Sequence, residues 1–181
     1  MNSPLASAGH WMHLILFRHG PAGDQDPARW PSDVDRPLTT NGIERTRLAA
    51  RGLARLVNEV AFILTSPYER ARQTAAIVSE TFDKTTVETL QALACGASPR
   101  GVLAAIEKFH SDRTVILVGH EPDLGMLAAA LIGSACALPL KKAGACSIAF
   151  ENAPRAGGGH LQWYVPPRIL RRLAGKEVRA I

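Results

Sequence analysis

Three apolar runs that do not alternate strictly with polar residues place the strongest limit on how this chain can fold. They cover residues 12–17, 60–64 and 115–118. Strands buried on both faces have this pattern, and such strands belong to parallel sheets that helices cover on both sides. A helix-like segment follows each run. We therefore predict the α/β class, as a three-layer α/β/α sandwich around a mostly parallel central sheet.

Capping residues and prolines indicate where the helices begin. Asn41 is expected to cap a helix that runs to about residue 58, with Glu44 completing a capping box three residues later. Further helices are expected at 67–82, 98–110 and 122–133, because a proline stands at or next to the first residue of each segment.

The C-terminal part of the chain has a different pattern. Residues 145–150 and 160–165 flank a glycine-rich linker, which is typical of a β-hairpin. A short helix is expected after Pro167, packed through Ile169 and Leu173 with its arginines facing outward.

The length of the chain fits one domain. A chain of 181 residues can bury a full core, and we expect a single domain at 12–181 after a flexible extension at 1–11. No apolar run approaches the roughly 20 residues that cross a bilayer, and the N-terminus lacks the basic region of a signal peptide. We expect a monomer that acts in the cytoplasm and not at a membrane.

The cysteine count and the charge favour neither a metal site nor a nucleic-acid site. Cys95, Cys136 and Cys146 are odd in number and have no metal-ligand spacing, which suits a reducing compartment. The net charge of +5 is spread along helical segments without a nucleic-acid-binding motif. A positive balance of this kind suits a small anionic ligand equally well.

Basic residues follow each of the three predicted parallel strands. Arg18 and His19 come after the first, Arg70 follows the second after a short turn, and His120 follows the third. Taken singly, each arginine is more simply interpreted as a surface charge, and each histidine as a hydrogen-bonded structural residue. Ligands of open parallel sheets bind at the carboxyl ends of the strands, so together these residues predict an anion site at one sheet edge.

Four motifs, taken in order, resemble those of a known family. The segments LILFRHG, LTTNG, LTSPYERARQTA and VILVGHEPDLG are similar to the histidine phosphatase superfamily, which has the phosphoglycerate-mutase-like fold. The short length and the later segments LKKAGA and LQWYVPPRIL resemble its SixA-type phosphohistidine phosphatase branch most. The resemblance extends from residue 12 to about residue 173.

The resemblance implies a role for each basic residue. His19 is the implied nucleophile that becomes phosphorylated, while Arg18, Arg70 and His120 form the implied phosphate pocket, with no metal or cofactor. The chemistry agrees, because phosphoryl transfer depends on positioning and on stabilising charge spread over the equatorial oxygens. Arginine forks bind phosphate oxygens bidentately, and nearby cations lower the pKa of an attacking imidazole.

One feature of larger members of the superfamily has no counterpart here. They carry a carboxylic acid in the segment after the second arginine's helix, where this chain has TLQALACGASPR without an acid. A departing imidazole can take its proton from water, so the absence favours phosphohistidine over an alkyl ester as the substrate. Substitutes for the acid remain open, as do their simpler interpretations as loop or capping residues: Asp24, Asp33, Asp35, Glu121 and Asp123.

Three functions therefore stay open at this stage. The favoured one is a metal-independent phosphatase acting on phosphohistidine of a phosphotransfer or signalling protein. The alternatives are a general small-molecule phosphomonoesterase and a phosphate-binding module without turnover. Lys141 and Lys142 either line the rim of the site or serve only as solvated surface charges.

Overall fold

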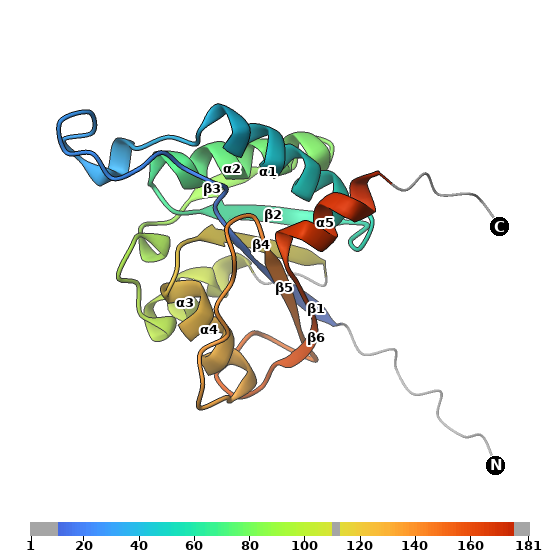
Figure 1. Cartoon of the computed structure of the whole chain (residues 1–181). Coiled ribbons are helices and arrows are strands. Elements are labelled where there is room, and N and C mark those ends of the chain that lie inside the picture. Colours follow the sequence, from blue (N-terminus) through green and yellow to red (C-terminus); the bar gives the residue numbers. More distant parts are fainter. Residues whose placement is uncertain (1–10, 110–112, 176–181) are drawn as a thin grey trace, which may run out of the picture.

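A computed structural model describes residues 11–109 and 113–175, and these contain a sheet of six strands in the order β3-β2-β4-β1-β5-β6 (Figure 1). The strands are β1 Met12–Arg18, β2 Val60–Thr65, β3 Val87–Thr89, β4 Thr114–Gly119, β5 Ala145–Phe150 and β6 His160–Val165. Strand β3 was not predicted, since only three residues of it pair with β2. The predicted extension at 1–11 lies outside the described residues except for Trp11.

Four neighbouring strands pair in parallel, and of the remaining two only β5 runs in the opposite direction, because β6 reverses again beside it. Strand β1 pairs in parallel with β4, and β4 pairs in parallel with β2. On its other edge β1 pairs antiparallel with β5, which forms the predicted hairpin with β6. The ends of β1, β2 and β4 consequently lie side by side, with Arg18 opposite Gly119 and Thr65 opposite Val118.

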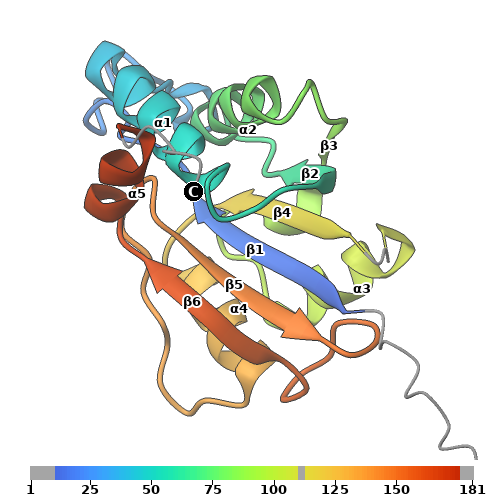
Figure 2. The same ribbon diagram turned by 90° about the vertical axis from the view of Figure 1, so that its right-hand side faces the viewer.

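Helices cover both faces of the sheet (Figure 2). Helices α1 Thr40–Leu53, α2 Glu69–Thr81 and α5 Pro167–Ala174 lie on one face, and α3 Pro99–Ile106 and α4 Asp123–Ile132 lie on the other. Short 3₁₀ helices occupy Asp33–Asp35, Gln91–Leu93 and Glu107–Phe109. The predicted α/β/α sandwich with a mostly parallel sheet is therefore confirmed.

Strand β1 shows why its apolar run does not alternate with polar residues. Leu14 and Leu16 pack into the core under α3 and α4, whereas Ile15 and Phe17 pack into the core under α1, α2 and α5. All four side chains are buried. A strand in the middle of a covered sheet needs apolar side chains on both faces.

Two helix starts differ from the prediction. The cap of α1 is Thr39, whose hydroxyl accepts the Gly42 amide, so Asn41 lies inside the first turn. Helix α2 begins at Glu69, two residues after the proline expected to open it. The expected cap of α3 is confirmed, because the Ser98 hydroxyl accepts the Gly101 amide. The helix is shorter than the predicted 98–110, because α3 ends at Ile106 and a 3₁₀ helix at Glu107–Phe109 follows it.

The packing face of α5 also differs from the prediction. Leu170 is completely buried, whereas Ile169 is 40% exposed. The reason is close contact with α1, where a Cβ placed on Gly52 would collide with the carbonyl oxygen of Leu170. A glycine lets the two backbones approach and turns residue 170 toward the core. In the described part of the chain, no helix is long and apolar enough to cross a membrane.

Substituting Gly52 with alanine tests this contact. The added methyl group has to displace the α5 backbone, so we expect a loss of about 3 kcal/mol in the free energy of unfolding, measured by urea denaturation. The control is Gly175→Ala, where the nearest atom to a new Cβ is 3.9 Å away. Equal stability of the two variants would contradict close packing of α1 against α5.

Candidate active site

The three predicted segments meet at the carboxyl edge of the sheet. The His19 amide donates to the Gly119 carbonyl (3.0 Å), and the Ser66 amide donates to the Val118 carbonyl (3.0 Å). These bonds continue the pairing of β1, β4 and β2 one residue beyond the strands. They open into a cavity of about 540 Å³, named here the sheet-edge cavity, whose lining includes all four predicted site residues: Arg18, His19, Arg70 and His120.

His19 is held with one ring nitrogen occupied. Its Nδ1 donates to the carbonyl of Gly20 (2.7 Å), and the residue is only 5% exposed. The proton therefore sits on Nδ1, which leaves Nε2 with a free lone pair. Burial lowers the pKa of His19 to about 3 against the opposing effect of the Gly20 hydrogen bond. The arginines also lower this pKa, as predicted, but burial is the larger cause.

His120 lies beside His19 with 5.1 Å between the ring centroids. Its Nε2 is 2.7 Å from the Ser66 hydroxyl, which also accepts the Tyr68 amide at 3.3 Å. Because that hydroxyl already accepts one hydrogen bond, it can donate its own proton to Nε2, which puts the ring proton on Nδ1. Burial, with the charge of Arg70, lowers the pKa of His120 to about 4.

The two arginines are fixed by main-chain carbonyls. Arg18 donates through Nη1 to the Leu140 carbonyl (2.8 Å), and Arg70 donates through Nη1 to the Asp33 carbonyl (2.8 Å). Arg70 is 3% exposed and lies over the Tyr68 ring, with 4.8 Å from its guanidinium carbon to the ring centroid. Both guanidinium groups are thus held in place, although the pocket carries positive charge.

Unused hydrogen-bonding capacity collects at this one place. Within residues 11–109 and 113–175, the buried side-chain nitrogens and oxygens without a hydrogen-bond partner are Arg18 Nε, Arg70 Nε and His120 Nδ1. All three belong to residues that line the sheet-edge cavity. Buried polar atoms are nearly always paired in folded proteins. Three unpaired nitrogens around one cavity indicate a site for an anion with several acceptor oxygens.

Asp33 and Arg36 complete the pocket, and sequence reasoning did not find this arrangement. Asp33 accepts from Arg70 Nη2 (2.9 Å) and from Arg36 Nε (2.7 Å), while Arg36 also donates to the Gly23 carbonyl (2.7 Å). Burial tends to raise the pKa of Asp33, but the two arginines outweigh it and leave the pKa lowered. Asp33 is therefore an anchor for Arg70 and a poor proton donor.

The other carboxyl groups considered as acids differ in position. Asp24 and Glu121 line the sheet-edge cavity, whereas Asp35 and Asp123 are absent from its lining. Asp123 accepts the Gly96 amide at 2.8 Å. Burial raises the pKa of Glu121, although its carboxylate accepts the Leu140 amide.

Cys95 was also missed by the sequence reasoning. Its sulfur lies 3.6 Å from Nη2 of Arg70, and the residue lines the sheet-edge cavity. Burial raises the pKa of this thiol, which keeps it protonated. In the described residues, no group of three or more histidine, cysteine, aspartate or glutamate side chains is placed to hold a metal ion.

Gly20 has a packing role. A Cβ at this position would collide with the Thr46 hydroxyl on α1, and the Gly20 amide donates to the Thr74 hydroxyl (3.0 Å) on α2. The glycine therefore lets the loop after β1 fit between two helices.

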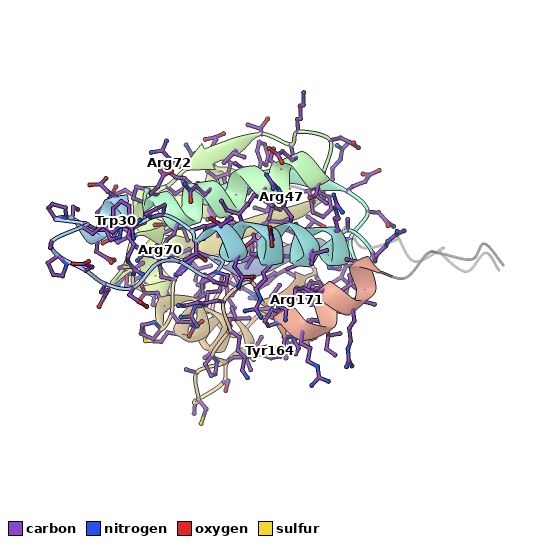
Figure 3. The ribbon with its side chains drawn as sticks, turned by 45° about the horizontal axis from the view of Figure 1, so that its top comes forward. Trp30, Arg47, Arg70, Arg72, Tyr164 and Arg171 are labelled. Carbon is purple, nitrogen blue, oxygen red and sulfur yellow. The ribbon has the colours of Figure 1, made fainter. Side chains whose placement is uncertain are left out.

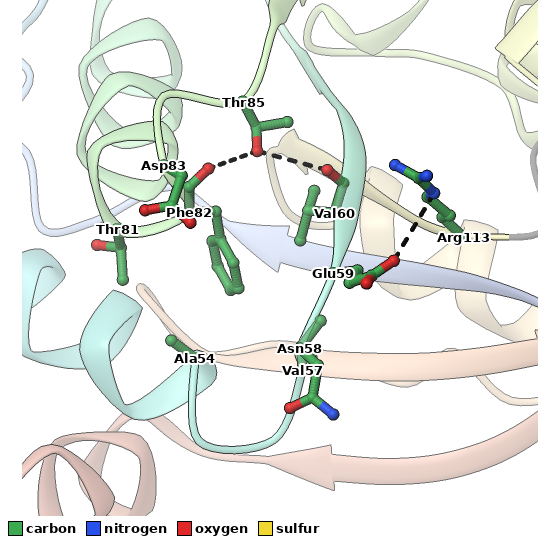
Figure 4. Close-up of a pocket in the computed structure, with 10 residues that line it drawn as sticks. All are labelled: Ala54, Val57, Asn58, Glu59, Val60, Thr81, Phe82, Asp83, Thr85 and Arg113. Atoms are coloured by element: carbon green, nitrogen blue, oxygen red, sulfur yellow. Dashed lines mark hydrogen bonds and ion pairs between the residues drawn. The ribbon is translucent and has the colours of Figure 1, made fainter.

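A second cavity, of about 410 Å³, lies at the opposite end of the strands (Figure 4). Thr85 bridges the Val60 and Phe82 carbonyls there, and Glu59 pairs with Arg113 at 3.7 Å. The lining holds no histidine and no cysteine. Among the described residues, the groups suited to phosphate chemistry gather in the sheet-edge cavity instead.

Comparison with known families and proteins identifies relatives of this chain. The family model described as histidine phosphatase superfamily (branch 1) matches residues 14–94. An uncharacterised protein of Picosynechococcus sp. is 40% identical over 155 residues, which cover 83% of this chain and 89% of that protein. The phosphohistidine phosphatase SixA of Escherichia coli is 29% identical over 163 residues, or 88% of this chain and 97% of SixA.

Solved structures give the same result. The protein histidine phosphatase SixA complexed with tungstate has a TM-score of 0.77 and 28% identity, over 88% of this chain and 99% of that one. A phosphoglycerate mutase from Plasmodium falciparum has a TM-score of 0.60 and 18% identity over 84% of this chain and 89% of its own. This likeness confirms the predicted phosphoglycerate-mutase-like fold.

The lowered histidine pKa values lead to a test by titration. The NMR signals of His19 and His120 should titrate below pH 5, because their pKa values are about 3 and about 4. Below pH 6.5 the unfolded chain takes up protons that the folded chain does not, so the free energy of unfolding falls as the pH drops toward 4.

The control is the His19→Gln/His120→Gln variant, in which this part of the pH dependence should be missing. If the signals of His19 and His120 titrate near pH 6.5 in the wild-type protein, these two rings are hydrated, which would contradict the described burial.

Proposed function

The chain belongs to the histidine phosphatase superfamily and is a phosphatase, and we propose that it hydrolyses phosphohistidine on proteins through a phosphorylated His19. One observation carries this proposal. A neutral His19 with a free Nε2 lines the same cavity as the residues that hold the three unpartnered nitrogens, Arg18, Arg70 and His120. A nucleophile and oxyanion donors that share one cavity form the minimum set for phosphoryl transfer.

The first step transfers the phosphoryl group to the enzyme. Nε2 of His19 forms a bond to phosphorus while the bond from phosphorus to the substrate nitrogen breaks, and the departing imidazole takes a proton from water. Arg18, Arg70 and His120 donate to the phosphoryl oxygens, whose charge spreads in the transition state. The Nδ1 proton shared with the Gly20 carbonyl holds the ring in orientation throughout.

The second step releases phosphate. A water molecule attacks phosphorus on the side opposite His19, the P–N bond to Nε2 breaks, and the electron pair returns to the ring. The proton lost by the water goes to phosphate or to solvent. No group in this cycle changes its oxidation state, and no cofactor supplies a reactant.

The leaving group sets the substrate class. Asp33 is ion-paired with Arg70, and the segment at 89–100 has no acid, so neither of these positions supplies a dedicated acid for an alkoxide. Imidazole leaves with help from solvent, which suits phosphohistidine. The name of the E. coli relative, phosphohistidine phosphatase, supports this class, and the tungstate complex of SixA supports an oxyanion site in the same fold.

Chemical trapping tests the intermediate. Wild-type protein quenched in alkali after mixing with ³²P-labelled phosphohistidine substrate should retain label, because phosphohistidine survives alkali. The His19→Ala variant should retain none, and His13→Ala serves as the matched histidine control on the same strand. Equal labelling of wild type and His19→Ala would reject the assignment of the nucleophile.

Arg70→Lys tests the fixed guanidinium. Lysine keeps the charge but cannot make the forked contacts to Asp33 and phosphate, so kcat/KM should fall about 100-fold. Arg72→Lys, on the exposed side of the same helix, should keep full activity. A loss of less than about threefold in Arg70→Lys would show that charge alone suffices.

A second function, hydrolysis of small phosphate esters, has one observation in its favour. Glu121 lines the sheet-edge cavity, and burial raises its pKa, which is the direction that favours proton donation to a leaving alkoxide. If esters are the substrates, Glu121→Gln lowers turnover of β-glycerophosphate at least tenfold and spares p-nitrophenyl phosphate, whose leaving group needs no acid. On our proposal, phosphohistidine is the far better substrate and its turnover is insensitive to this change.

A further inference from the structure

A second pocket adjoins the sheet-edge cavity, and its lining is strongly basic. It has a volume of about 490 Å³ and is lined by Arg18, Arg45, Lys141, Lys142, Arg171 and a floor of Pro21, Ala143 and Pro167. We call it the basic pocket. Arg18 and Lys142 line both cavities, so a ligand could contact both at once.

Among the described residues, one of these cations is partly balanced from outside the basic pocket, because the Glu121 carboxylate acts on Arg18 from the sheet-edge cavity. In the part of the chain that the structure describes, no carboxylate forms an ion pair with any of the five basic side chains. Asp24, Asp33 and Glu121 line the sheet-edge cavity but not the basic pocket. The pKa of Arg171 is lowered mainly by its own burial and, second, by the positive charge of nearby Arg45. Like charges held together repel one another and destabilise the fold unless a ligand compensates.

Specific contacts fix the backbone that carries these cations. Arg45 is on α1 and Arg171 on α5, the two helices joined at Gly52 and Leu170, and Figure 3 shows Arg171 on its helix beside α1. The lysines lie on the turn before β5, where buried Ala143 has a positive φ of 60°.

The turn is tied directly to the end of β1. The Ala143 amide donates to the carbonyls of Arg18 and His19 (both 3.1 Å), and the Arg18 amide donates to Gly144 (3.1 Å). A strained residue persists only where the surroundings enforce it, and such residues gather at functional sites. The same hydrogen bonds that position Arg18 and His19 therefore also position the two lysines.

The floor of the pocket indicates what kind of anion it takes. Two of its three residues are prolines without an amide proton, and the Ala143 amide is already used. A compact phosphate site normally offers main-chain amides, and this floor offers none. A floor that is apolar and a rim of long cationic side chains suit carboxylates carried on a peptide chain better than they suit a second phosphate.

We propose that the basic pocket binds an acidic segment of the phosphoprotein that places its phosphohistidine in the sheet-edge cavity. This inference rests on the proposed function, and it names the partner: a protein with aspartate or glutamate side chains next to the phosphorylated histidine. Arg18 lies between the two sites, with one anion on each side. The pocket selects substrates by their flanking charge, and of the residues that line it only Arg18 also takes part in the chemistry.

A matched pair of phosphohistidine peptides tests the proposal, one with glutamates around the phosphohistidine and one with glutamines. Wild-type protein should hydrolyse the acidic peptide with a kcat/KM about tenfold higher, as a few exposed ion pairs supply. The preference should shrink as salt rises from about 50 mM to about 500 mM, because salt screens exposed charges.

Two double variants locate the effect. Arg45→Glu/Arg171→Glu should abolish the preference while leaving p-nitrophenyl phosphate turnover unchanged. Arg47→Glu/Arg172→Glu makes the same charge change on the same two helices, at exposed residues that do not line the pocket, and should keep the preference. Residues one or two apart on a helix, such as Arg171 and Arg172 or Arg45 and Arg47, face different directions.

Each outcome separates this inference from the proposed function. Equal turnover of both peptides by wild-type protein overturns the acidic partner and leaves the phosphohistidine phosphatase standing. If neither peptide is hydrolysed, the proposed function fails, and binding of a fluorescent glutamate-rich peptide to wild type and Arg45→Glu/Arg171→Glu decides the pocket separately. A small bisphosphate is the probe for a small ligand. If wild-type protein hydrolyses it, Arg45→Glu/Arg171→Glu loses that turnover and wild type shows no peptide preference, the pocket belongs to a small ligand and the inference is overturned.

Discussion

The site depends on burying positive charge beside neutral imidazole. Arg70 is 3% exposed, and its charge is compensated by the Asp33 carboxylate and carbonyl. Its Nε has no hydrogen-bond partner and is left for a ligand of the sheet-edge cavity. The same burial keeps His19 unprotonated with its Nε2 available. A buried cation and a buried nitrogen without a hydrogen-bond partner are both costly in a folded protein. An incoming phosphoryl group relieves both costs at once, which explains why the groups are held ready.

The sheet makes this arrangement possible. Because β1 lies between β4 and β5, the loop after β1 is bonded on one side to Gly119 and on the other to the turn at Ala143. The nucleophile, the second histidine and the lysine-bearing turn are therefore joined through main-chain hydrogen bonds, which vary little with side-chain identity. Fold and site share the same few residues, and the basic pocket extends that set toward α1 and α5.

Sequence patterns predicted the parts of the molecule that depend on local chemistry. Continuous apolar runs predicted the buried strands, and the position of Arg18, His19 and His120 directly after them predicted a shared edge. Such patterns could not predict the hydrogen-bond partners that loops bring to the site. Asp33 reaches Arg70 from a proline-rich loop 37 residues away, which has no periodicity to interpret. For the eight-residue helix α5 the pattern favoured packing through Ile169 and Leu173, and the close contact with Gly52 explains why Leu170 is buried instead.

The most direct test of the account is a crystal structure of the protein soaked with tungstate, a stable mimic of the phosphoryl group. The account predicts one ion in the sheet-edge cavity, with its oxygens within hydrogen-bond distance of Arg18, Arg70 and His120 Nδ1, and with tungsten facing Nε2 of His19. Tungstate bound elsewhere, or bound in the cavity without contact to either arginine, would contradict it.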